Sequence, residues 1–256
     1  MSAGAMLEVR GISIAFGGLK AVQDFSLSIP RGGLYGLIGP NGAGKTTCFN
    51  LLTGVYTPNV GSIAVDGVDV TGLPPHQIAV AGLSRTFQNI RLFGQLSVLD
   101  NVLLGLHLRG RHSLASTLLR TGFHVSQERA MAALAMRLLE TFGLANRAEE
   151  QGKNLPYGDQ RRLEIARALA TEPKVLLLDE PAAGMNPQEK KALRELIQRV
   201  RREFGVTILL IEHDMGVVMN ICERITVLNF GQTIASGTPD EVQNDPKVIE
   251  AYLGTE

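Results

Sequence analysis

The chain has 256 residues, of which 45% are hydrophobic and 20% are charged, and these proportions are typical of a globular protein rather than a disordered or fibrous one. Its 25 basic residues balance 25 acidic ones, which argues against nucleic acid as the default partner. Two cysteines argue against a disulfide framework, and no apolar run is long enough to cross a bilayer.

The first thirty residues predict an antiparallel sheet. Apolar and polar side chains alternate between Leu7 and Ile29, with a turn expected at Gly17 and Gly18. One face of this sheet would therefore be buried and the other would face water.

A glycine-rich stretch follows the apolar run 34–38 and precedes a predicted helix over 47–52. It consists of Gly39, Pro40, Asn41, Gly42, Ala43, Gly44, Lys45 and Thr46. A turn of this kind lets backbone N–H groups converge on an anion at the start of a helix. Lys45 would reach the outer phosphates and the Thr46 hydroxyl would bind Mg²⁺. The sequence therefore predicts a nucleoside-triphosphate site.

Two side chains beside this loop each have two interpretations. Phe16 stands at the expected turn, where its ring would either stack on adenine or belong to the core or hairpin, and spacing alone does not separate these. Cys48 lies in the first turn of the predicted helix. It is either a reactive thiol with a lowered pKa or a small buried apolar residue.

The middle of the chain changes from strand to helix. Residues 61–70 alternate around a turn at 66–67, and 84–89 reads as a strand end that carries Gln88, ordinarily a surface residue type. Helical spacing extends from Ser97, an expected cap, to Gly143 with a break at 109–112, and a second helix is expected from Arg161 to Pro173. We expect a helical subdomain inserted into an α/β core.

The second half predicts further strands of a parallel sheet. Residues 175–178 are apolar on both faces and end in Asp179 and Glu180, whereas 207–211 ends just before His213. Such strand ends meet at one edge, where one carboxylate can hold Mg²⁺ through water and its neighbour can orient a water. A helix over 187–204, a hairpin over 225–234 and a capped helix ending near Leu253 complete the expected elements.

Taken together, these motifs resemble the nucleotide-binding subunits of ABC transporters along essentially the whole chain. The resemblance implies an α/β fold, a P-loop NTPase (RecA-like) core with an antiparallel β subdomain and an inserted α-helical subdomain. It implies one ABC ATPase domain over 1–256. Residues 6–94 would form the antiparallel part and the first part of the core, 95–165 the helical subdomain with the signature motif, and 166–256 the rest.

The resemblance also implies roles for individual residues. The catalytic residues would be Glu180, His213, Lys45 and Gln88, and the Mg²⁺ ligands would be Thr46, Gln88 and Asp179. ATP would contact Phe16, Gly39, Pro40, Asn41, Gly42, Ala43, Gly44, Lys45, Thr46 and Thr47. The signature motif would offer Tyr157, Gly158 and Asp159 to the nucleotide held by a second subunit.

Several stretches are similar to one of the two ATPases of branched-chain amino-acid importers, namely 85–93, 157–164, 181–187 and 212–215. This resemblance implies ATP hydrolysis coupled to transport by a peripheral subunit at the cytoplasmic face of the inner membrane. The partners would be a second ABC ATPase, two transmembrane permeases and, indirectly, a periplasmic binding protein, with no nucleic acid. Two alternatives stay open: an ATPase of lipopolysaccharide extraction or export, and a soluble ABC ATPase that acts on nucleic acid.

The sequence departs from the family pattern in two places. Pro156 and Tyr157 occupy the serine and first glycine positions of the signature, and proline offers neither a hydroxyl nor an N–H to a phosphate. Asn186 stands where aspartate is commoner in the dimer-contact loop. Both differences suggest a heterodimer in which the two ATP sites are unequal.

Overall fold

The computed structural model describes residues 4–107 and 122–253. Contacts divide the chain into two compact units, one that combines Met1–Gln88 with Lys174–Glu256 and one that consists of Asn89–Pro173. The segment 95–165, expected to be helical, falls within the second unit. No helix among the described residues is both long and apolar enough to span a membrane.

A four-stranded antiparallel sheet opens the first unit. Its strands are β1 (Ala5–Phe16), β2 (Leu19–Pro30), β4 (Val60–Val65) and β5 (Val68–Asp69), in the order β2-β1-β4-β5. Buried and more exposed side chains alternate along β2, as the sequence predicts for a sheet with one face in the core. The predicted antiparallel pairing and the turn between β1 and β2 are confirmed.

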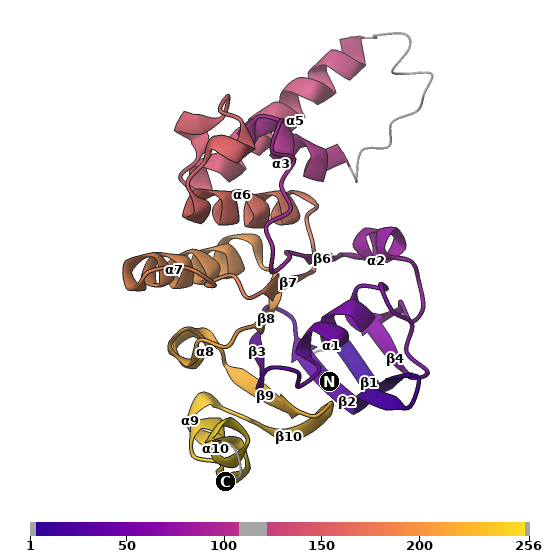
Figure 1. The fold of residues 1–256 in the computed structure, drawn as a ribbon. Coiled ribbons are helices and arrows are strands. Elements are labelled where there is room, and N and C mark those ends of the chain that lie inside the picture. The colour runs from indigo at the N-terminus through magenta and orange to yellow at the C-terminus, as the bar shows by residue number, and fades with distance from the viewer. Residues whose placement is uncertain (1–3, 108–121, 254–256) are drawn as a thin grey trace. The chain divides into compact units, whose positions relative to one another are not determined.

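A six-stranded sheet forms the core of the same unit (Figure 1). It contains β3 (Leu34–Ile38), β6 (Leu83–Arg85), β7 (Val175–Asp179), β8 (Thr207–Ile211), β9 (Arg224–Asn229) and β10 (Gln232–Gly237) in the order β10-β9-β3-β8-β7-β6. All neighbours are parallel except β10 with β9. Since β3, β7 and β8 run in one direction, the segments that follow them emerge at one edge of the sheet.

The helices of the first unit are α1 (Lys45–Leu52), α2 (Pro75–Ala81), α7 (Pro187–Phe204), α8 (Met215–Ile221), α9 (Pro239–Gln243) and α10 (Pro246–Leu253). Asn186 caps α7, because its side chain accepts hydrogen bonds from the N–H groups of Gln188 and Glu189. The single helix expected to end near Leu253 is divided into α9 and α10. Pro246 begins the second of them, since a proline suits the first position of a helix but not its interior.

The second unit is helical, with α3 (Val98–His107), α5 (Gly122–Thr141), two short 3₁₀ turns (Ala145–Arg147 and Gly152–Asn154) and α6 (Tyr157–Ala170). Ser97 caps α3 as predicted, its Oγ accepting the Asp100 N–H over 3.0 Å. The expected start of α6 at Arg161 is wrong by one turn, because Pro156 takes the N-cap position. The predicted break at 109–112 lies outside the described residues.

Candidate functional site

The glycine-rich loop joins β3 to α1 in a backbone path that only glycine adopts without strain. Gly39 has a φ of 152°, and a Cβ there would lie 2.1 Å from the carbonyl oxygen of Leu228. Gly44 caps α1 in a left-handed conformation with a φ of 101°. The loop can therefore turn tightly enough to aim the first N–H groups of α1, which have no partner within the helix, at an anion.

The side chain of Lys45 folds back onto this loop. Its Nζ donates hydrogen bonds to the carbonyl oxygens of Gly39 over 2.6 Å and Pro40 over 2.9 Å, and the residue is only 8% exposed. Burial lowers the pKa of Lys45, while the carboxylates of Glu180 and Asp179 oppose this shift. An incoming phosphate group can replace the two carbonyl partners of the amine without moving the backbone.

Glu180 contacts two other residues that lie shortly after strands of the six-stranded sheet, Gln88 and His213. Its Oε2 accepts a hydrogen bond from Gln88 Nε2 over 2.9 Å and lies 3.5 Å from His213 Nδ1. Its backbone N–H donates to the carbonyl of Ile211 at the end of β8, and its φ of 46° lies in the left-handed region that a residue with a side chain rarely occupies. The structure thus brings together three of the residues that the sequence predicts to be catalytic.

Asp179, the last residue of β7, is 3% exposed and is held from two sides. Its N–H donates to Thr86 Oγ1 over 3.2 Å, and its Oδ2 accepts from Arg85 Nη2 over 2.6 Å. The expected Mg²⁺ ligands, Thr46, Gln88 and Asp179, offer hydroxyl, amide and carboxylate oxygens, the hard donors that Mg²⁺ prefers. No group of three His, Cys, Asp or Glu side chains suited to a metal occurs in the described ranges. This donor set fits an ion that is held largely by the phosphates of its nucleotide.

A cavity of about 520 Å³ opens in front of the loop, a volume within the usual range for a ligand of nucleotide size. Besides the loop itself, its wall includes Phe16, Lys20, Gln88, Glu180 and Phe230.

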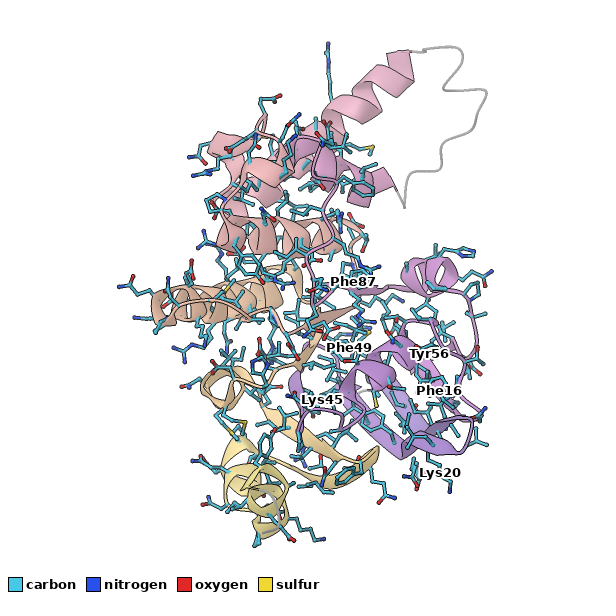
Figure 2. The ribbon with its side chains drawn as sticks, in the orientation of Figure 1. Phe16, Lys20, Lys45, Phe49, Tyr56 and Phe87 are labelled. Atoms are coloured by element: carbon cyan, nitrogen blue, oxygen red, sulfur yellow. The ribbon has the colours of Figure 1, made fainter. Side chains whose placement is uncertain are left out.

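The ring of Phe16 is 45% exposed and packs edge-to-face on Tyr56, with 5.1 Å between ring centroids. Figure 2 shows these two rings beside each other. Since Phe16 is exposed at the rim of the cavity, its interpretation as a core residue is wrong. Phe16 ends β1 at the turn to β2, which agrees with its interpretation as a hairpin residue.

Cys48 is completely buried in α1, and burial raises its pKa to about 12. Its interpretation as a reactive thiol is therefore wrong, because desolvation of the thiolate outweighs any effect of the helix N-terminus.

The signature residues belong to the second unit, where they begin α6. Tyr157 and Gly158 follow Pro156 directly, and Asp159 lies 3.5 Å from Arg162 Nη1. Beneath them Arg161 is fully buried in an ion pair with Glu164 over 2.7 Å. Both residues belong to α6, so this ion pair lies within the helix.

Glu212 was not identified from the sequence as a functional residue. Its side chain is 0% exposed, and its Oε1 accepts the N–H of Ala182 over 2.7 Å, so that it joins the loop after Glu180 to the loop of His213. Burial raises the pKa of Glu212, and its Oε2 has no hydrogen-bond partner among the described residues. Its position beside His213 at a strand end was the available signal. Arg85 was missed as well, since an arginine in a short strand has no distinctive spacing.

Comparison with known protein families gives two matches. The model described as ABC transporter matches residues 22–183, and the model described as branched-chain amino acid ATP-binding cassette transporter matches residues 232–256.

Individual relatives agree with these matches. The chain is 50% identical to the high-affinity branched-chain amino acid transport ATP-binding protein LivG of Salmonella typhimurium, over 97% of this chain and 98% of that one. It is 46% identical to BraF of Pseudomonas aeruginosa over the same shares. Among solved structures, the ADP conformation of MJ1267, an ATP-binding cassette of an ABC transporter, matches with a TM-score of 0.85 and 32% identity, over 98% of this chain and 99% of that one.

Proposed function

Since the chain belongs to the ABC transporter family, we propose that it binds and hydrolyses ATP to drive an importer of branched-chain amino acids. One observation supports the chemistry above all others: Glu180 contacts both Gln88 and His213 at the rim of the cavity that the glycine-rich loop lines. The substrate class is supported by the 50% identity to LivG and by the family match at residues 232–256.

In the proposed complex, the adenine ring stacks on Phe16 and the phosphates lie against the backbone from Gly39 to Thr47. Lys45 transfers its hydrogen bonds from the loop carbonyls to the outer phosphates. Thr46, Gln88 and, through water, Asp179 would hold Mg²⁺, which would supply positive charge to the phosphates of the nucleotide.

Glu180 acts as the base for the attacking water. Its Oε2 is held by Gln88 and His213, which leaves Oε1 to accept a hydrogen bond or a proton from that water. His213 lies on the same edge of the sheet and stabilises negative charge on the γ-phosphate. Because Gln88 lies shortly after β6 and contacts the base, a displacement of its loop would change the position of Glu180.

The proposed assembly follows from the family. ATPase subunits of importers act with transmembrane permeases, and we infer two permeases, a periplasmic binding protein and a second ABC ATPase at the cytoplasmic face of the inner membrane. Tyr157, Gly158 and Asp159 would contact the nucleotide of the second ATPase. Because Pro156 lacks a hydroxyl and an N–H, that site would be the weaker one, which favours a heterodimer.

One experiment tests the assembly. A tagged Glu180→Gln variant is trapped with Mg·ATP, extracted gently from native membranes, and its co-purifying proteins are identified. Two permeases and a second ATPase with an intact Leu-Ser-Gly-Gly signature would support the proposal. Recovery of the variant without membrane subunits would contradict it.

A second candidate function is lipopolysaccharide export. The chain is 35% identical to the lipopolysaccharide export system ATP-binding protein LptB of Escherichia coli, over 98% of each chain. The ATP chemistry would be the same, and the identity of the captured permeases would separate the two. The higher identity to LivG favours amino-acid import.

A further inference from the structure

Arg85 is a buried cation that contacts two parts of the ATP site at once. It is the last residue of β6, and its side chain is 8% exposed. Its Nη2 donates to Asp179 Oδ2 over 2.6 Å, and its Nη1 donates to Asn50 Oδ1 on α1 over 2.7 Å. The guanidinium thus ties the strand end that carries Asp179 to the helix that carries Lys45 and Thr46.

Two aromatic rings contact the same guanidinium. Its central carbon lies 5.5 Å from the ring centroid of Phe49 on α1 and 5.2 Å from that of Phe87, the neighbour of Gln88. Figure 2 labels both rings. Contacts at these distances are attractive and restrict the plane of the guanidinium. Arg85 therefore also contacts the segment that leads to Gln88.

We propose that Arg85 is a positioning residue for Mg²⁺: it fixes the carboxylate of Asp179, and in this way it sets the affinity of the nucleotide-loaded protein for the ion. The proposal rests on the function proposed above, because it takes Asp179 as the residue that holds Mg²⁺ through water. With Oδ2 engaged by Arg85, Oδ1 is the oxygen that can face the water shell of the metal.

Two physical effects oppose each other at this site. A positive guanidinium repels Mg²⁺, but it also holds the carboxylate of the nearly buried Asp179 in one orientation. Two hydrogen bonds and two ring contacts fix the guanidinium, and on this ground we take orientation as the larger effect. Arg85 Nε is buried without a hydrogen-bond partner among the described residues, so the guanidinium is placed to satisfy Asp179 and Asn50 rather than all its own donors.

Lysine separates these two effects. An Arg85→Lys variant keeps the positive charge but loses the planar guanidinium. It therefore loses the pair of donors that reaches Asp179 and Asn50 together. It also loses the flat group that contacts the two rings. If charge alone mattered, the variant would bind Mg²⁺ as the wild type does. If orientation matters, it would bind Mg²⁺ more weakly.

The experiment measures binding rather than turnover. A fluorescent ATP analogue is bound to the protein in EDTA, and Mg²⁺ is then titrated in while the signal is followed; Mn²⁺ binding followed by electron paramagnetic resonance gives a second readout. We expect Arg85→Lys to bind the analogue in EDTA within about twofold of wild type and to need about tenfold more Mg²⁺, the loss typical when a group that orients a metal ligand is removed. The matched control is Arg31→Lys, which alters an exposed ion pair with Asp66.

Two further variants test the role of Arg85 and the role of Asp179 separately. Asn50→Ala removes one anchor of Arg85, and we expect a smaller loss of Mg²⁺ affinity, about threefold; it decides the question if Arg85→Lys fails to fold. An unchanged or lower Mg²⁺ requirement in folded Arg85→Lys, or in Asn50→Ala if Arg85→Lys fails to fold, would overturn the proposal. Asp179→Asn tests the premise separately, because an unchanged Mg²⁺ requirement there would overturn the role of Asp179 itself.

Discussion

Gln88 donates a hydrogen bond to the carboxylate of Glu180 over 2.9 Å, although 92 positions separate the two residues in the chain. Gln88 follows β6 and Glu180 follows β7, and these strands are parallel neighbours in the six-stranded sheet. The proposed base is therefore held by a residue that follows the neighbouring strand of the sheet.

Replacing Glu180 with glutamine should abolish ATP turnover and leave ATP binding intact. The amide cannot accept a proton from water, and loss of a general base typically reduces rates by about 10²–10⁴-fold. Phosphate release in a single turnover and equilibrium binding of ATP are the two measurements. Glu195→Gln, on the exposed face of α7, is the control. A variant that hydrolysed ATP at the normal rate would remove Glu180 from the mechanism.

Replacing Phe16 with alanine should weaken ATP binding by about tenfold, because stacking of a base on an aromatic ring is typically worth about 1–3 kcal/mol. Binding of inorganic tripolyphosphate, which has no base, should not change. Tyr56→Ala should weaken ATP binding less, since Tyr56 supports the ring of Phe16 from the side. Equal losses for ATP and tripolyphosphate would show that Phe16 shapes the loop instead; Phe204→Ala, at the exposed end of α7, is the control.

The stability of the protein should depend on pH through Glu212. Burial is the main cause that raises the pKa of this carboxyl above its ordinary value of 4.5, and hydrogen bonds from the backbone of Ala182 and Asp214 are the main causes that oppose the shift. Between the ordinary and the raised value the folded protein keeps a proton that the unfolded chain has lost. The free energy of unfolding therefore falls as the pH rises through this window.

Glu212→Gln removes this dependence and keeps an acceptor for the Ala182 N–H. The wild type loses stability as the pH rises from 4.5 to the raised pKa of Glu212, and the variant does not. We therefore expect the melting temperature of the variant to increase relative to that of the wild type over this range, by about 2–4 °C for each kcal/mol. Thermal unfolding at several pH values without nucleotide measures it. A difference between the two proteins that stays constant with pH would contradict the assignment.

Both cysteines should resist alkylation in the native protein. Burial raises the pKa values of Cys48 and Cys222 to about 12, so almost no reactive thiolate is present at pH 8. Iodoacetamide should label neither residue in the folded protein and both after denaturation, as read by mass spectrometry. ATP should make no difference; labelling of native Cys48 that ATP blocks would restore the reactive-thiol interpretation.

Local patterns predicted most of the strands, because many strands either alternate between buried and exposed side chains, as β2 does, or are buried throughout, as β7 and β8 are. The pairs β1–β2 and β4–β5 and the buried strands β7 and β8 follow directly from such patterns. Helix ends were harder to place. The start of α6 at Tyr157 depends on Pro156 in a cap position, and the interruption before Pro246 depends on one residue.

The residues of the site also fall into two groups, those that local sequence patterns predict and those that they do not. The glycine-rich loop is contiguous, so its spacing alone predicts its chemistry. Arg85 and Glu212 act through partners 94 and 30 positions away, namely Asp179 and Ala182. Contacts of this range depend on strand order and register, which a single sequence does not contain.

The left-handed backbone of Glu180 has an evolutionary consequence. Holding a residue other than glycine in this conformation lowers the free energy of unfolding by on the order of 1 kcal/mol, whereas glycine adopts it freely. At position 180 the demands of folding and of hydrolysis therefore oppose each other. Laboratory evolution selected only for thermostability should bring glycine to this position, and selection for transport should restore the glutamate.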